Sequence, residues 1–155
     1  MNSWFDILSL EGGLKNINGQ DVINNSKIIE KNIHDEAKLL KGDYTKVFLG
    51  GFSQGCSMSL FTGLSLKENV GGIVGCSGTF FKHLIKVNET KRTIPMFYYI
   101  GEDDQVVDCW HAKKSLQPLI DLTFNIEIHS EKYLQHSLSD TELVKLRAFF
   151  KKNMI

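Results

Sequence analysis

The sequence has few cysteines and none of the cysteine patterns that mark whole classes of small proteins. Only three occur among 155 residues, at Cys56, Cys76 and Cys109, with no Cys-x-x-Cys pair and no Cys/His cluster at zinc spacing. An odd, widely separated set is typical of reduced thiols, which favours the cytoplasm over an oxidising compartment. We therefore expect free thiols, no metal site and no other cofactor.

Neither sign of charge is in excess, because 18 Lys and Arg residues balance 18 Asp and Glu residues. Domains that bind the phosphate backbone of nucleic acids carry a basic excess on one face. Electrostatic attraction to an anionic membrane surface needs the same excess. The composition therefore argues against nucleic acid as a partner and gives no electrostatic case for a membrane.

Long hydrophobic runs are also missing. The longest apolar run, residues 94–100, is far shorter than the roughly 20 residues of a membrane-spanning helix. The N-terminal residues lack the basic segment and long apolar stretch of a secretory signal. With 42% hydrophobic and 23% charged residues, the chain has the composition and length of one globular domain. We expect a single domain over residues 1–155, without an integral membrane segment, in the cytoplasm.

Short apolar runs alternate with amphipathic stretches, which predicts an α/β fold with a mostly parallel sheet flanked by helices. The run at 46–50 is apolar without alternation, as expected for a strand covered on both faces, whereas the run at 124–129 alternates like a strand near an edge. The predicted strands cover residues 46–50, 71–76, 94–100 and 124–129, and the predicted helices cover 21–41, 55–66, 80–87, 110–122 (interrupted at Pro118) and 139–152.

A Gly-x-Ser-x-Gly motif, Gly51-Phe52-Ser53-Gln54-Gly55, lies between a predicted strand and a predicted helix. In such a nucleophile elbow the serine is held in a strained backbone conformation, and the two glycines are expected to avoid a collision. The Ser53 hydroxyl then stands at the positive end of the following helix, and the N–H of Gln54 points at an oxyanion. The alternative interpretation is a glycine-rich turn with an incidental serine.

A nucleophilic serine needs a base and an acid that orients the base, and in this type of fold the acid precedes the histidine in the chain. Asp104 follows the third predicted strand and is the candidate acid, with Asp103 and Asp108 as competitors. His136 follows the fourth predicted strand and is the candidate base. His129 is its rival, although it ends a strand instead of lying in the loop beyond. Together the three side chains outline a Ser-His-Asp hydrolase.

These residues resemble the acyl-protein thioesterase family, also called the phospholipase/carboxylesterase family of small α/β-hydrolases. The resemblance extends over nearly the whole chain, and the nucleophile elbow with its glutamine is the most specific match. The segments that carry it are Ser3-Trp4-Phe5-Asp6-Ile7, Gly50 to Gly55, Gly101 with Asp104, Val106 and Val107, and His136-Ser137 followed by Glu142.

The resemblance implies hydrolysis of acyl esters or thioesters through an acyl-enzyme intermediate. It makes Ser53 the nucleophile, His136 the general base and then acid, and Asp104 the residue that orients His136. The implied substrates are S-acylated proteins, which such an enzyme depalmitoylates, or lysophospholipids. Trp4 and the loop at 77–81 are candidates for lining the acyl site, although a bulky residue at such positions is more often part of the core.

The sequence departs from the family pattern at its start. Family members carry earlier strands, and a His-Gly-containing loop that supplies a second oxyanion donor, ahead of the Ser-Trp-Phe-Asp segment; this sequence begins just before that segment. We therefore expect an N-terminally truncated α/β-hydrolase sheet. Loss of one donor costs on the order of 10²–10³ in kcat. The strand at 46–50 would have a bare edge, which invites self-association.

Two other functions are compatible with the pattern. The first is a catalytically impaired α/β-hydrolase remnant that binds an acyl group or a partner protein. The second is a flavodoxin-like nucleotide or flavin binder, which is weaker because no glycine-rich phosphate loop follows the first predicted strand apart from the elbow itself.

Overall fold

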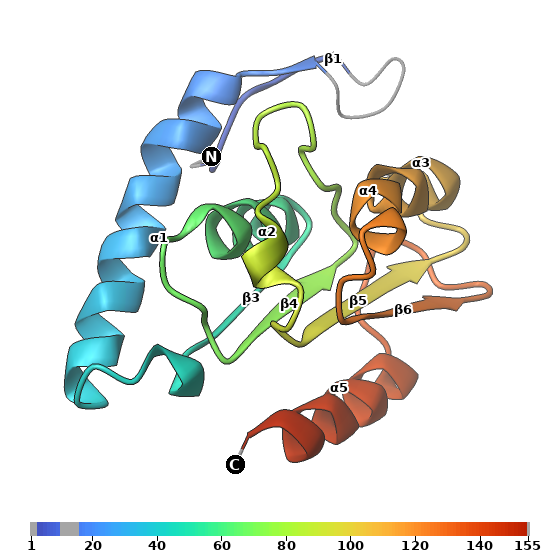
Figure 1. The fold of residues 1–155 in the computed structure, drawn as a ribbon. Coiled ribbons are helices and arrows are strands. Elements are labelled where there is room, and N and C mark those ends of the chain that lie inside the picture. The colour runs from blue at the N-terminus through green and yellow to red at the C-terminus, as the bar shows by residue number, and fades with distance from the viewer. Residues whose placement is uncertain (1–2, 10–15, 155) are drawn as a thin grey trace.

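The computed structural model describes residues 3–9 and 16–154, and a four-stranded parallel sheet lies at its centre (Figure 1). The strand order is β3-β4-β5-β6, so each strand pairs with the next one along the chain. Each crossover contains helices or a long loop, as parallel pairing requires. The bounds are β3 (Phe48–Phe52), β4 (Gly72–Cys76), β5 (Met96–Gly101) and β6 (Ile126–Glu131).

Helices cover both faces of this sheet. Alternate residues of a strand point to opposite faces, and β4 and β5 divide their side chains accordingly between two cores. Ile73 and Tyr98 belong to the larger core, which the first four helices cover, whereas Val74 and Phe97 pack with Phe149 of the last helix. The helices are α1 (Gly19–Leu39), α2 (Gln54–Ser65), α3 (Cys109–Ser115), α4 (Gln117–Asp121) and α5 (Asp140–Asn153).

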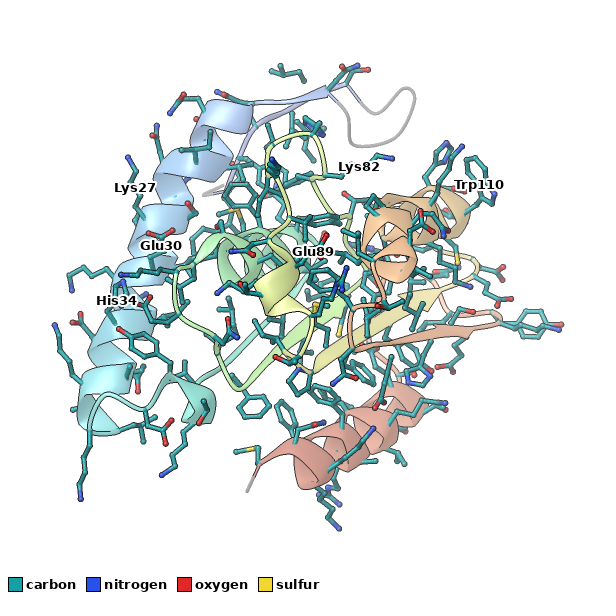
Figure 2. All side chains as sticks on the ribbon, in the orientation of Figure 1. Lys27, Glu30, His34, Lys82, Glu89 and Trp110 are labelled. Carbon is teal, nitrogen blue, oxygen red and sulfur yellow. The ribbon has the colours of Figure 1, made fainter. Side chains whose placement is uncertain are left out.

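The predicted helices at 21–41, 55–66 and 139–152 are confirmed with small shifts of their ends. The side chains of Asn18 and Ser139 cap α1 and α5 by accepting hydrogen bonds from backbone N–H groups. The predicted helix at 110–122 is interrupted as expected, because Pro118 lies in the first turn of α4. Lys27 on α1 and Trp110 on α3 project outward on opposite sides of the molecule (Figure 2).

The predicted helix at 80–87 is wrong, because this segment forms turns without a helix. Tertiary contacts compete with the local pattern: the Phe80 N–H donates to Ser115 Oγ at 2.9 Å, and the Phe81 ring packs edge-on against Phe5 with centroids 5.2 Å apart. A short 3-10 helix, η2 (Glu89–Lys91), follows instead.

An antiparallel pair near the N-terminus was not predicted. It consists of β1 (Ile7–Ser9) and β2 (Asn16–Ile17), which form a separate two-stranded sheet. Both strands are too short to show a period in the sequence, and β1 is mostly exposed.

Strand β3 differs from its prediction in position and burial. It begins two residues later than expected, after a 3-10 turn, η1 (Tyr44–Lys46). Its residues are half-buried and Gly50 is exposed, so the expected cover on both faces is incomplete. As the resemblance implied, β3 is a terminal strand with one neighbour among the strands that the structure describes.

Candidate active site

The turn after β3 has the geometry of a nucleophile elbow. Ser53 stands between β3 and α2 with φ 55° and ψ −119°, a left-handed conformation that a non-glycine residue adopts only under constraint. Its N–H continues the sheet ladder by donating to the Cys76 carbonyl at 2.8 Å. Ser53 is therefore placed by the sheet on one side and by the start of α2 on the other.

Only one of the two motif glycines is sterically required. A Cβ on Gly51 would lie 2.3 Å from the carbonyl atoms of Gly55, whereas a Cβ on Gly55 would meet nothing within 4 Å. The expectation that both glycines avoid a collision is thus wrong for Gly55. A third glycine has that role: a Cβ on Gly78 would lie 2.5 Å from the Ser53 carbonyl oxygen. This contact comes from the loop after β4, which motif spacing does not reveal.

The structure brings the three predicted side chains together. His136 Nε2 lies 3.0 Å from Ser53 Oγ, and His136 Nδ1 lies 2.8 Å from Asp104 Oδ2. A carboxylate only accepts hydrogen bonds, so the imidazole proton belongs on Nδ1, and Nε2 is left to accept from the serine hydroxyl. The Phe52 ring packs against the imidazole with centroids 4.8 Å apart.

Backbone N–H groups hold the Asp104 side chain in addition to its contact with His136. Its side chain is fully buried, and Oδ1 accepts hydrogen bonds from the N–H groups of Val106 at 2.9 Å and Val107 at 2.8 Å. One carboxylate oxygen is thus held by the backbone, and the other is left for His136. Both valines belong to the segments that carry the resemblance, and their N–H groups fix the turn that follows Asp104.

The competing residues lie elsewhere. Asp108 caps α3 by accepting from the His111 N–H at 2.8 Å, and Asp103 is exposed. His129 lies on β6, where its ring packs against Phe97 with centroids 5.3 Å apart. Phe97 faces the core under α5, so His129 belongs to that layer and not to the end of the strands.

Gln54 begins α2, and its side chain has a second role that the sequence did not predict. Its Oε1 accepts from the Trp4 N–H at 2.9 Å, and its Nε2 donates to the Phe5 carbonyl at 3.0 Å. Asn25 of α1 donates to the Trp4 carbonyl at 2.6 Å. Gln54 therefore ties the Ser-Trp-Phe segment to the turn that carries Ser53.

A cavity of about 680 Å³ opens beside Ser53. Ser53 and Trp4 line it, together with the open side of β3 and one side of α1. The segment 77–81, a second candidate for the acyl site, is buried in the core and does not line this cavity. Other residues that line the cavity include Ile29, Asn32, Glu36, Phe48, Gly50 and Met58.

Two further features of the described residues concern ligands and membranes. Among residues 3–9 and 16–154, no three His, Cys, Asp or Glu side chains gather closely enough to hold a metal ion. Within the same ranges, no helix combines the length and the apolar character needed to cross a bilayer.

Comparison with solved structures shows the class of protein to which this fold belongs. Arabidopsis thaliana SOBER1 superposes with a TM-score of 0.86 and 26% sequence identity, over 100% of this chain and 75% of that chain. Zea mays acyl-protein thioesterase 2 superposes with a TM-score of 0.79 at 20% identity, over 99% of this chain and 73% of the other. A parallel sheet of this order with a serine elbow after β3 is the α/β-hydrolase fold.

Sequence comparison then gives the family. The family model for phospholipase/carboxylesterase matches residues 1–154. Acyl-protein thioesterase 1 of Gibberella zeae is 30% identical over 162 residues, covering 99% of this chain and 69% of that protein. Acyl-protein thioesterase 1 of Saccharomyces cerevisiae is 30% identical, covering 99% and 70%. The chain belongs to the phospholipase/carboxylesterase family.

Proposed function

We propose that this chain is a serine hydrolase that cleaves carboxylic acyl esters or thioesters through an acyl-enzyme on Ser53. The observation that carries the proposal is the continuous series of polar contacts from Ser53 through His136 to Asp104, at the carboxyl end of parallel strands. The family membership supports the same reaction class.

In this mechanism, Ser53 Oγ attacks the substrate carbonyl while His136 Nε2 takes the hydroxyl proton. The protonated imidazole gives that proton to the departing alcohol or thiol, and Asp104 stabilises the positive ring and keeps Nδ1 protonated. Water then attacks the acyl-enzyme with His136 again as the base. The negative charge that develops on the carbonyl oxygen is met by the N–H of Gln54, at the positive end of α2.

The proposed substrates are acylated proteins or lysophospholipids. Relatives named acyl-protein thioesterases support the former class. Trp4 lines the cavity beside Ser53 and is 39% exposed, so its indole offers an apolar wall to an acyl chain that enters there. Depalmitoylation of cytoplasmic proteins is the activity we expect.

A fluorophosphonate probe tests the proposal, because it phosphonylates only a serine that a neighbouring base activates. We expect covalent labelling of the full chain and loss of labelling in Ser53→Ala. The matched control is Ser65→Ala, at an exposed serine at the opposite end of α2 from Ser53. Folded protein that takes up no label would contradict the hydrolase and support the alternative, an acyl- or protein-binding module that keeps the fold.

We also propose that the open side of β3 mediates self-association. The edge strand has one neighbour among the described strands, and an unpaired strand edge is a template for another chain.

A further inference from the structure

The loop that carries His136 is closed at its base by one carboxylate. Glu131 is the last residue of β6, and Ser139 caps α5; the histidine loop runs between them. Ser139 Oγ donates to Glu131 Oε2 at 2.5 Å, and Tyr99 Oη donates to the same oxygen at 2.7 Å. Both ends of the loop are thereby joined to β5.

The charge states favour this arrangement. Hydrogen bonds from Ser139 and Tyr99 lower the pKa of Glu131, so its carboxylate stays ionised and accepts. Burial, with the hydrogen bond to Glu131, raises the pKa of Tyr99 to about 12, so its hydroxyl stays protonated and donates. Charge-assisted hydrogen bonds of this kind are shorter and stronger than neutral ones.

Tyr99 also connects this contact to the acid. It lies on β5, beside β6 in the sheet, two residues before Gly101, where the chain enters the Asp104 turn (Figure 1). The two loops meet directly there, since the Asp103 N–H donates to the Leu134 carbonyl at 3.1 Å. A Cβ on Gly101 would lie 2.1 Å from that carbonyl oxygen, so the loops are in close contact.

We propose that Glu131 is a positioning residue that holds His136 between Ser53 and Asp104, through its bonds to Tyr99 and Ser139. The inference rests on the proposed function for its kinetic effect. Glu131 touches neither the substrate nor the reacting atoms. Without it, the base of the loop opens and the imidazole samples positions away from the nucleophile, and a displacement of about 1 Å costs on the order of 100-fold in rate.

Three variants of the full chain separate positioning from charge. Glu131→Ala removes both bonds, and we expect kcat to fall about 10- to 100-fold with little change in KM. Glu131→Gln removes the charge but keeps an acceptor oxygen, and we expect most of kcat to return. Tyr99→Phe removes one donor and should give an intermediate kcat, and it tests the inference if Glu131→Ala does not fold.

The matched control is Glu127→Ala, on the same strand and face, which removes a carboxylate that pairs with Lys152 at 2.7 Å. It should keep the wild-type kcat. A wild-type kcat in folded Glu131→Ala, or an equal loss in Glu131→Gln, would overturn the positioning role.

A second readout does not depend on activity. The His136 proton shared with Asp104 should give a sharp low-field NMR signal in the wild type and in Glu131→Gln. We expect that signal to broaden or vanish in Glu131→Ala because the loop moves. If the wild type is inactive and takes up no fluorophosphonate label, but the NMR signal changes among the variants as expected, the hydrolase is rejected and the positioning role is kept. An unchanged signal in Glu131→Ala would reject the positioning role.

Discussion

At the residue scale, the two glycines of the elbow motif should respond differently to the same substitution. In Gly51→Ala the new methyl group would lie 2.3 Å from backbone atoms of Gly55, which cannot move without distorting α2. We expect a loss of about 1–3 kcal/mol in the free energy of unfolding and loss of fluorophosphonate labelling. The measurement is urea denaturation followed by circular dichroism, together with the labelling assay.

Gly55→Ala is the matched control for this prediction. Its methyl group meets nothing within 4 Å, and alanine has a higher helix propensity than glycine, so stability should be unchanged or rise by about 0.4–1 kcal/mol. Equal destabilisation by the two substitutions would show that the elbow is not packed as described.

Glu142 should make stability depend on pH. Its side chain is buried, Oε1 has no hydrogen-bond partner among the described residues, and burial raises the pKa of this carboxyl above its usual 4.5, with the Glu131 charge adding to the rise. The folded state therefore binds this proton more tightly than the unfolded state does. Its contribution to the free energy of unfolding is complete below pH 4.5 and is lost as the pH rises through the raised pKa.

Glu142→Gln should remove this contribution and flatten the fall in stability above pH 4.5, measured by urea denaturation across a pH series. Glu36→Gln, a substitution at an exposed position of α1, serves as the control and should leave the slope unchanged. A slope in Glu142→Gln equal to that of the wild type would assign the pH dependence to another group.

The sequence predicted some residues of the candidate site and missed others for a physical reason. Ser53, Asp104 and His136 each follow a predicted strand, so parallel topology alone brings them to one edge. The side-chain contacts of Gln54 and the role of Glu131 depend on segments far apart in the chain. No local pattern reports such contacts, because they arise only when distant segments pack together.

At the element scale, one buried cation holds the connection between α2 and β4. The Lys91 side chain is 1% exposed, and its ammonium group donates to the Lys67 carbonyl at 3.1 Å and the Glu68 carbonyl at 2.5 Å. Lys91→Met leaves both carbonyls without this donor, and we expect a loss of about 1–3 kcal/mol in the free energy of unfolding. Burial lowers the pKa of Lys91, so the cost of desolvating the ammonium offsets part of this loss.

Lys82→Met is the control for the Lys91 substitution, since Lys82 is exposed (Figure 2). It should change the free energy of unfolding by less than about 0.5 kcal/mol. If both substitutions have the same effect in urea denaturation, the Lys91 ammonium does not stabilise this connection.

Helices could be predicted where their own residues show apolar side chains at helical spacing or capping side chains at the ends. Helix α1 has apolar residues at helical spacing, and that spacing placed it within two residues of its observed ends, whereas the Asn18 cap was not predicted. The prediction for segment 80–87 is wrong because contacts from distant segments, Ser115 for Phe80 and Phe5 for Phe81, hold both phenylalanines in the core. Tertiary packing decides such short apolar segments.

At the scale of the whole molecule, the two edges of the sheet are protected differently. The Val47 carbonyl and the Ser53 N–H form hydrogen bonds on the β4 side of the strand. Because the backbone groups of alternate residues point to opposite sides of a strand, those of Phe48, Gly50 and Phe52 face the open side. This stretch carries no charged side chain. The opposite edge, β6, carries three titratable residues, including Glu127. Charged side chains on an edge strand discourage pairing with another chain, so association is expected through β3.

A single charge on that edge should therefore prevent self-association. In Gly50→Lys the charged side chain would be buried without a partner if another strand paired with β3, so we expect the wild type to form dimers or larger species at micromolar concentrations and Gly50→Lys to remain monomeric. Gly50→Ala is the matched control: it adds the same Cβ, 3.2 Å from the Val74 Cβ, without charge, and should associate like the wild type. Light scattering across a dilution series measures the mass of all three, and a wild type with the mass of one chain at every concentration would contradict association through β3.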